Sequence, residues 1–246
     1  MDAIQLLKNR RSVRKYKDQI VPRELIEEIV KLSQFAPSWS NYQVARYNII
    51  DNRSLIEEIA NNCVQGFVYN AKTLTRANGV VVLSYVTGKS GSLKDKVKPE
   101  DVVSDNSGAW ECFDAGIACL QFCLSAYAKG VATCVLGVIN NDAIAQKIGL
   151  PENEKVAALI VYGYEAGEHH EAPVRKDINE ILRFVRINIF ILCFASVFNN
   201  WSFLYYNSGY IRNRNYNNSC TFYRSRLPVC LFQQSSLRFR YYQICP

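Results

Sequence analysis

Histidine and metal-type cysteine pairs are nearly absent from this sequence. Its 246 residues include two adjacent histidines, His169 and His170, and nine cysteines that form no Cys-x-x-Cys pair. Structural zinc sites commonly draw their Cys and His ligands from such closely spaced pairs, so we expect no metal site. The odd cysteine count also argues against a complete disulfide framework. We therefore predict reduced, mostly buried thiols in a cytoplasmic protein.

The sequence also shows no secretory leader and no long hydrophobic run. Met1 leads directly into an amphipathic segment, and the apolar stretch 187–198 is shorter than the ~20 residues that a membrane span needs. The hydrophobic share of 49% is typical of a soluble globular chain. We expect no membrane partner.

Acidic residues are missing from the last quarter of the chain. Residues 186–246 contain seven arginines and no Lys, Asp or Glu, so this segment accounts for the whole formal net charge of +7. Residues 1–185 hold 22 basic and 22 acidic side chains and give no reason to expect nucleic-acid binding. The tail has an abnormal composition without lasting periodicity, and we interpret it as an out-of-frame or read-through extension rather than an evolved domain. A tail that binds membranes or nucleic acid is the alternative.

Two catalytic motifs are incomplete. Gly88-Lys89-Ser90 follows an apolar strand, but Leu83 stands where a phosphate-binding loop needs its first glycine. No Gly-x-Ser-x-Gly elbow is present, and the His169-His170 pair lies among glutamates, so we predict solvated surface histidines. The sequence therefore disfavours a nucleotide hydrolase and a serine hydrolase.

The apolar periodicity predicts a mixed fold with helices and strands in no strict alternation, which favours the α+β class. Helices are expected at 22–36, 54–63, 109–129, 142–148 and 177–184. Strands are expected at 47–50, 79–86, 131–138 and 156–164, with a polar loop at 88–105.

Three separated segments carry the chemistry of a site for a phosphorylated cofactor. The first contains Arg10, Arg11, Ser12 and Arg14 at the end of a short helix, and Arg175 could close the same site from far along the chain. Guanidinium forks match phosphate oxygens. The segment 37–43 adds hydroxyl, amide and aromatic groups suited to a flat heteroaromatic ring. A solvated helix end and a plain polar loop are the alternatives.

Over residues 1–185 the ordered motifs resemble those of the FMN-dependent nitroreductases. The matches are Arg-Arg-Ser-Val-Arg at 10–14, Pro-Ser-x-x-Asn-x-Gln at 37–43, and further segments at 113–116, 128–137, 148–151, 161–164 and 173–176. The resemblance implies an α+β fold whose mostly antiparallel central sheet is wrapped by helices. It also implies an intertwined homodimer with FMN at the subunit interface.

The resemblance also implies a role for each matched residue. Arg10, Ser12 and Arg175 would hold the FMN phosphate, with Arg11 in the same cluster, and Arg14 would lie near the N1/C2 edge of the ring. Asn70 would bond the pyrimidine end, and the backbone of Leu136 and Gly137 would approach N5. The partner subunit would supply the remaining group, which comprises Pro37, Ser38, Asn41 and, less specifically, Gln43.

In such enzymes the flavin carries the chemistry, and no side chain acts as a catalytic acid, base or nucleophile. NAD(P)H would reduce the flavin, and a nitroaromatic or quinone would then be reduced in a ping-pong sequence, with Arg14 as electrostatic support. Trp39, Val44 and Glu165 depart from the usual pattern and leave substrate choice open. The alternatives are a flavoenzyme of the same fold that acts on enoates or halogenated aromatics, and a flavin-binding redox sensor without turnover.

Overall fold

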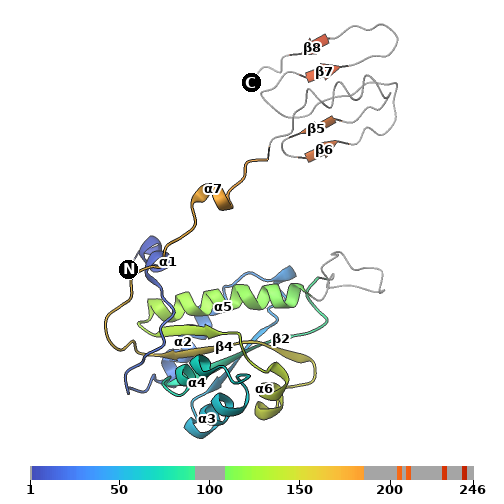
Figure 1. Ribbon diagram of the computed structural model, residues 1–246. Helices are drawn as coiled ribbons and strands as arrows, with labels where there is room; N and C mark the ends of the chain where they lie inside the picture. Colours follow the sequence, from blue (N-terminus) through green and yellow to red (C-terminus); the bar gives the residue numbers. More distant parts are fainter. Residues whose placement is uncertain are drawn as a thin grey trace. The chain divides into compact units, whose positions relative to one another are not determined.

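The computed structural model describes residues 2–91 and 109–185, together with four short strands between residues 204 and 242. The chain divides into two compact units, Met1–Pro173 and Val174–Pro246. In the first unit a sheet lies between two sets of helices (Figure 1). No helix among the described residues is long and apolar enough to cross a membrane.

The sheet of the first unit is antiparallel throughout. It contains β1 (Ala45–Ile50), β2 (Gly79–Val86), β3 (Ala132–Leu136) and β4 (Glu154–Gly163) in the order β1-β2-β4-β3. The α+β prediction and its mostly antiparallel sheet are confirmed. β1 and β3 form the two edges of the sheet, and this decides which predicted site residues can meet.

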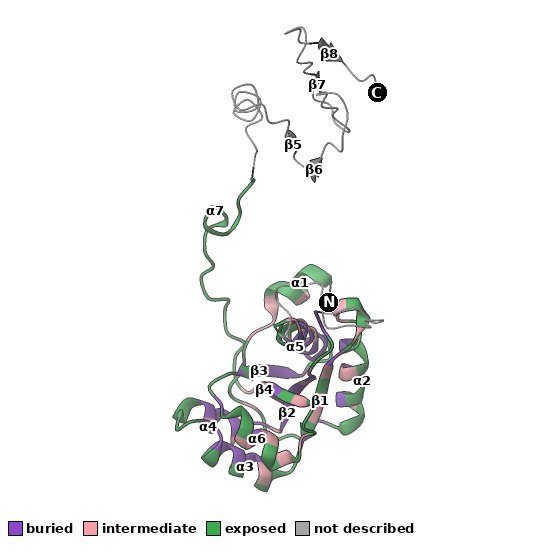
Figure 2. Cartoon of the chain, turned by 90° about the vertical axis from the view of Figure 1, so that its right-hand side faces the viewer, coloured by how far each residue is buried: buried purple, intermediate pink, exposed green. Residues whose placement is uncertain are grey.

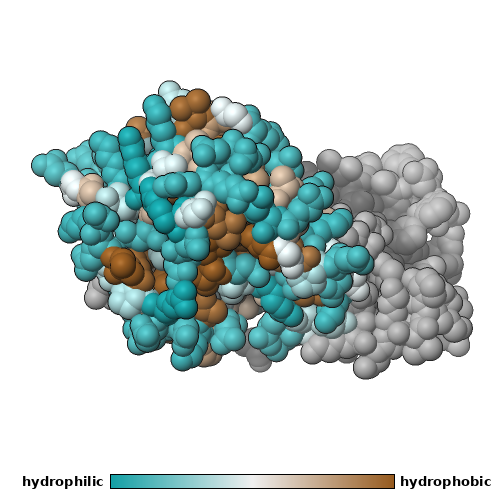
Figure 3. Space-filling view, turned by 90° about the horizontal axis from the view of Figure 1, so that it is seen from below, coloured by the Kyte–Doolittle hydropathy of each residue, from teal (hydrophilic) through white to brown (hydrophobic). Residues whose placement is uncertain are grey.

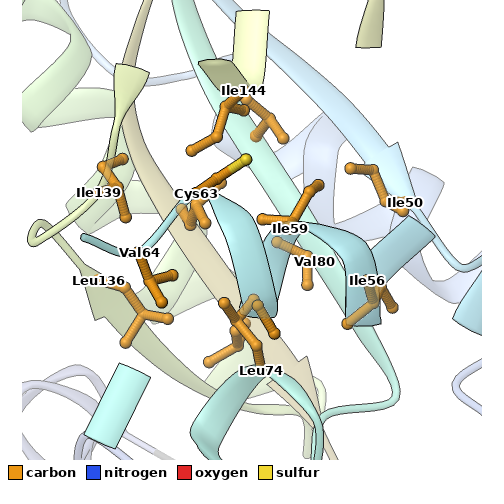
Figure 4. Close-up of a cluster of buried hydrophobic side chains, with 14 of the residues drawn as sticks. Ile50, Ile56, Ile59, Cys63, Val64, Leu74, Val80, Leu136, Ile139 and Ile144 are labelled. Carbon is orange, nitrogen blue, oxygen red and sulfur yellow. The ribbon is translucent and has the colours of Figure 1, made fainter. Parts of the chain in front are cut away.

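The central strands are buried on both faces because their side chains alternate between two hydrophobic clusters. Val80 and Val82 join one cluster with α3 (Arg53–Asn62), α4 (Val68–Leu74) and α6 (Asn141–Ile148) (Figure 4). Val81 and Leu83 join the other cluster, with α2 (Arg23–Ser33) and α5 (Trp110–Ala128). Figure 2 shows buried strands between helices whose outer faces are exposed. The continuous β-branched run that predicted a buried strand at 79–86 therefore reflects burial on both sides.

Side-chain caps and left-handed glycines set the helix ends. Asn52 accepts the N–H of Leu55 at 3.0 Å and starts α3, and Asn140 caps α6 in the same way. Gly149 ends α6 with a φ of 64°, and Gly130 follows α5 with a φ of 76°. The expected ends of these helices agree with the structure to within one or two residues.

Two helices differ from the prediction. α7 covers only Ile178–Ile181 of the expected 177–184, because the capping box of Asp177 and Glu180 starts a helix in which no residue is buried. α4 was not predicted; it begins after Gln65 and Gly66, which both have positive φ values. A helix of seven residues gives too short a periodic pattern to be recognised.

The second unit contains α7 and two small two-stranded sheets. β5 (Leu204–Tyr206) pairs with β6 (Gly209–Ile211), and β7 (Val229–Leu231) pairs with β8 (Arg240–Tyr242). Most of the predicted 186–246 tail and most of the expected 88–105 loop lie outside the described residues. The boundary at residue 185 stays a prediction.

Candidate cofactor-binding site

The arginine-rich segment runs along the β3 edge of the sheet. Ser12 forms a parallel bridge with Thr133, and the Val13 N–H donates to the Thr133 carbonyl at 2.9 Å. Val13 is buried, while Ser12 and Arg14 on either side of it are exposed. This alternation is that of an extended chain, which turns the hydroxyl and the guanidinium away from the core.

The arginines in this segment have different surroundings. The guanidinium of Arg11 donates to the carbonyls of Lys8 at 2.6 Å, Arg10 at 2.8 Å and His170 at 3.2 Å, so it ties backbone segments together. The guanidinium of Arg14 makes a longer contact, 3.4 Å, with the Ser12 carbonyl. Arg14 therefore keeps most of its donors for a ligand, whereas those of Arg11 are largely used.

The far end of β3 meets α4. The side-chain amide of Asn70, which is 7% exposed, donates to the Val138 carbonyl at 3.1 Å. Leu136 is buried, and a Cβ added at Gly137 would meet no atom within 4 Å. The backbone at Gly137 thus faces open space, next to a fixed carboxamide.

Ser12, Asn70 and Gly137 therefore gather along one sheet edge although they are far apart in sequence. Ser12 lies beside Thr133, and Gly137 follows four residues later, about 13 Å along an extended strand. Basic groups lie at one end of this edge and an amide with open backbone at the other. Such an arrangement suits a ligand with an anionic end and a flat polar end.

The predicted ring-facing segment 37–43 lies at the opposite edge. It leads into β1, and β2 and β4 separate β1 from β3, so at least three interstrand spacings, about 14 Å, lie between the two groups. Ser38 Oγ accepts the Gln43 N–H at 2.9 Å, and Ser40, Asn41 and Gln43 have positive φ values. Within one chain, Pro37, Ser38, Asn41 and Gln43 are not brought to Gly137.

A buried aspartate in α5 holds this loop; the sequence analysis included it in the matched segment 113–116 but predicted no role for it. Asp114 is 3% exposed, accepts the Trp39 N–H through both carboxylate oxygens and accepts the Ser90 hydroxyl at 2.7 Å. A cavity of about 260 Å³ lies beside the loop; Ser38 of the loop, Ser33 of α2 and Asp114 of α5 are among the residues that line it. Two acidic residues within an apolar helix, Glu111 and Asp114, were the available signal.

Three thiols lie close to Arg10. Cys119 and Cys123 are one helical turn apart on α5, and the hydrogen bond between them lowers the pKa of Cys123 to about 7 and raises that of Cys119. The positive charge of Arg10 acts in the same direction on Cys123. Burial raises the pKa of Cys134. Within residues 2–91 and 109–185, no group of His, Cys, Asp and Glu could hold a metal ion.

Arg175 belongs to the second unit and is exposed. Its predicted contact with a phosphate held by Arg10 and Ser12 stays a prediction.

The surface around α4 carries apolar side chains. Phe67, Val68 and Tyr69 are each more than 40% exposed, and the Phe67 and Tyr69 rings lie 5.5 Å apart. Figure 3 shows a mostly hydrophilic face of the molecule that is interrupted by apolar patches. Exposed rings that precede Asn70 in the chain provide apolar surface for a flat ligand.

Comparison with known proteins gives consistent results. The sequence pattern of the Nitroreductase family matches residues 7–164. A protein of Archaeoglobus fulgidus, named as a candidate NADH dehydrogenase/NAD(P)H nitroreductase, is 26% identical over 189 residues, which cover 74% of this chain and 97% of the relative.

Solved structures show the same fold. A nitroreductase family protein of Clostridium difficile 630 superposes with a TM-score of 0.62 at 21% identity, over 76% of this chain and all of that one. A candidate nitroreductase of Exiguobacterium sibiricum, solved in complex with FMN, gives 0.61 at 21% identity, over 75% of this chain and 98% of that one. With its family pattern spanning the four-stranded sheet and the Ser12, Asn70 and Gly137 edge, the chain belongs to the Nitroreductase family.

Proposed function

We propose that this protein is an FMN-dependent oxidoreductase that uses NAD(P)H to reduce nitroaromatics, quinones or similar acceptors. The observation that carries the proposal is the gathering of Ser12, Asn70 and the open backbone of Gly137 along one sheet edge. Bound FMN would supply hydride acceptance and donation at N5, which gives a ping-pong sequence between NAD(P)H and the acceptor.

The residues at the β3 edge fit that cofactor. Arg10 and Ser12 would hold the phosphate, since guanidinium and hydroxyl donors match its oxygens. The amide nitrogen of Asn70 is used by Val138, which leaves Oδ1 to accept an N–H from the pyrimidine end of the ring. A side chain at Gly137 would fill the space that the ring needs, so glycine permits a close backbone approach.

Arg14 would act through its charge. It is exposed beside Ser12, and among the described residues its guanidinium has one long contact, with the Ser12 carbonyl. A fixed positive charge near N1 would favour the reduced, anionic ring, and such preorganised charge is most effective where water is excluded. No side chain is needed as a covalent nucleophile.

A second copy of the chain would complete the site. Pro37, Ser38, Asn41 and Gln43 lie at the β1 edge and cannot reach Gly137 in the same chain. The outer face of α5 exposes Phe113 and Leu120, with exposed fractions of 58% and 56%. A homodimer that covers this apolar face and brings the β1-edge loop over the partner's flavin accounts for both features. We propose the cytoplasm as its location.

The proposal is tested on the purified full-length chain reconstituted with FMN. We expect a yellow dimer by size-exclusion chromatography that loses its colour with NADPH or NADH under anaerobic conditions and regains it on addition of a nitroaromatic or a quinone. Enoates and halogenated aromatics in the same panel would reveal a different acceptor class. Bound flavin that neither nicotinamide reduces would instead identify a redox sensor.

The role of Arg14 has its own matched comparison. Arg14→Ala should retain FMN but slow flavin reduction in stopped-flow measurements by about tenfold or more, whereas Arg23→Ala, at an exposed arginine of α2 that pairs with Asp51, should not. Equal reduction rates in the two variants would refute the assignment of Arg14.

A further inference from the structure

The segment that carries the phosphate-binding residues is held in place by the chain that follows β4. The Lys17 N–H donates to the Tyr164 carbonyl at 2.8 Å, and the Ala166 N–H donates to the Lys15 carbonyl at 3.1 Å. Tyr16 and Glu165 form an antiparallel bridge between these two bonds. Residues 15–17 are thereby paired by backbone bonds, but Asn9 to Arg11 lie beyond this pairing and need other contacts.

His169 supplies such a contact. Its Nδ1 lies 2.7 Å from Glu165 Oε2, and its Nε2 lies 2.8 Å from the carbonyl oxygen of Asn9. The ring also stacks on Tyr127 of α5, with ring centroids 6.0 Å apart and planes 24° apart. His169 and His170 are both exposed, as expected of surface histidines, but both ring nitrogens and one ring face of His169 are engaged, which the sequence did not predict.

The two partners of His169 fix its protonation state. A carboxylate and a backbone carbonyl are both acceptors, so both ring nitrogens must donate. Only the imidazolium carries two N–H groups, since neutral histidine would present a lone pair to one of the acceptors. The observed geometry is therefore that of protonated His169, which links Glu165 to Asn9.

This link acts on the residues next to Asn9. Arg10 follows Asn9 directly, and Arg11 Nε donates to the carbonyl of His170 at 3.2 Å. His169 and His170 thus hold Asn9 and Arg11, the residues on either side of Arg10. The Arg10 backbone lies between these anchors, at the end of α1 (Ala3–Asn9).

We propose that protonated His169 is a positioning residue that anchors Asn9 to Arg11 for phosphate binding, so that affinity for FMN falls when His169 loses its proton. The proposal rests on the proposed function, because it assigns the phosphate to this segment. His169 itself does not touch the ligand; it acts by fixing the chain that carries Arg10.

The charged groups around His169 set the direction of the pH dependence. Glu165 raises the pKa of His169, and the Asn9 carbonyl adds to this, whereas the charge of Arg11 opposes it. The Tyr127 ring packs on His169 from α5. The anchor is therefore complete below the ordinary histidine pKa of about 6.5 and is lost as the pH rises through the raised folded value.

The first test uses the FMN-free protein, so it does not depend on cofactor binding. The chain has two histidines, and the imidazole NMR signal that disappears in His169→Gln should show a raised pKa in the wild type and a lower one in Glu165→Gln. Amide hydrogen exchange in residues 3–11, corrected for the intrinsic effect of pH, should rise with pH in the wild type and be uniformly fast in His169→Gln. A slow, pH-independent α1 region in His169→Gln would overturn the anchor.

The second test measures the dissociation constant of FMN between about pH 6 and 9 by quenching of flavin fluorescence. We expect a rise of about tenfold across the titration of His169, the loss expected for one charge-assisted hydrogen bond. At low pH the His169→Gln variant should already bind FMN as weakly as the wild type does at high pH. Its dissociation constant should not rise further across this pH range. The matched control, His170→Gln, should follow the wild type because its exposed ring is not part of the anchor.

Cys123 also titrates in this range near Arg10, so the same measurement on Cys123→Ala separates the two groups. A slope that persists in His169→Gln and vanishes in Cys123→Ala would refute the assignment to His169. A protein that binds no FMN at any pH would refute the proposed function, while the imidazole titration and the amide exchange would still decide whether the anchor exists.

Discussion

The carboxylate of Asp114 accepts the backbone N–H of Trp39 through both oxygens, at 3.1 and 3.2 Å, and so fixes the loop before β1 to the second turn of α5. The same carboxylate accepts the hydroxyl of Ser90, which is 3% exposed. A single buried side chain therefore satisfies groups from two loops that are far apart in sequence. A loop held in this way can present Ser38 and Asn41 to a second subunit in one conformation.

Asp114→Ala should release this loop. The substitution removes the carboxylate that accepts the buried Ser90 hydroxyl and the partly buried Trp39 N–H. Loss of these two hydrogen bonds should lower the free energy of unfolding by about 2 to 4 kcal/mol. We expect a lower midpoint in urea denaturation and faster hydrogen exchange at the Trp39 amide itself. Asp18→Ala, at an exposed aspartate, is the control and should change neither quantity. Unchanged exchange at Trp39 would show that the loop is held by other contacts.

Gly79→Ala should destabilise the sheet. A Cβ at Gly79, the first residue of β2, would overlap the side chain of Tyr162, which is 2% exposed and has no room to move aside. Forcing extra volume into such a packed site typically costs about 1 to 3 kcal/mol. Thermal denaturation should show the loss, and Tyr162→Leu in the same chain should recover part of it. Additive effects of the two substitutions would contradict the overlap.

The strands of the sheet could be predicted closely because the local sequence favours one secondary structure there. Val80, Val82 and Leu83 lie in a β-branched and apolar run that only a strand buried on both faces accommodates, and Gly130 marks the end of α5 by its left-handed conformation. α4 escaped prediction because its seven residues are too few to show a helical period in the sequence.

The functional site could be predicted only in part from the sequence. The arginine-rich segment around Ser12 was selected by the chemistry of its side chains, the amide at Asn70 was found through a family resemblance, and periodicity alone would have selected neither. The bond from Trp39 to Asp114 joins residues 75 positions apart, and that from Asn9 to His169 joins residues 160 apart. Contacts of this kind depend on how the elements pack, so local patterns cannot reveal them.

One thiol of the pair on α5, that of Cys123, should ionise near neutral pH. The hydrogen bond from Cys119 lowers the pKa of Cys123 to about 7 against the opposing effect of burial. In Cys119→Ala the burial effect remains without that bond, so the pKa of Cys123 should rise. The ultraviolet absorbance of thiolate, followed against pH and corrected with a Cys123→Ala variant, measures the change. Cys63→Ala removes a buried thiol elsewhere and should leave the Cys123 titration where it was; a pKa that stays near 7 without Cys119 would assign the shift to the Thr133 hydroxyl and the charge of Arg10 instead.

Substitution of Gly137 should separate folding from cofactor binding. A Cβ at this position meets no atom within 4 Å, and the residue does not have a positive φ, so Gly137→Ala and Gly137→Val should leave the melting temperature of the FMN-free protein nearly unchanged. Both side chains would enter the space proposed for the flavin ring. The dissociation constant of FMN should therefore rise, by about tenfold for alanine and further for valine, the latter because its two methyl groups extend deeper into the same space. Gly79→Ala should show the opposite pattern, with lower stability and little direct effect on the ring site. Equal FMN affinity in the wild type and Gly137→Val would mean that the ring lies away from the end of β3.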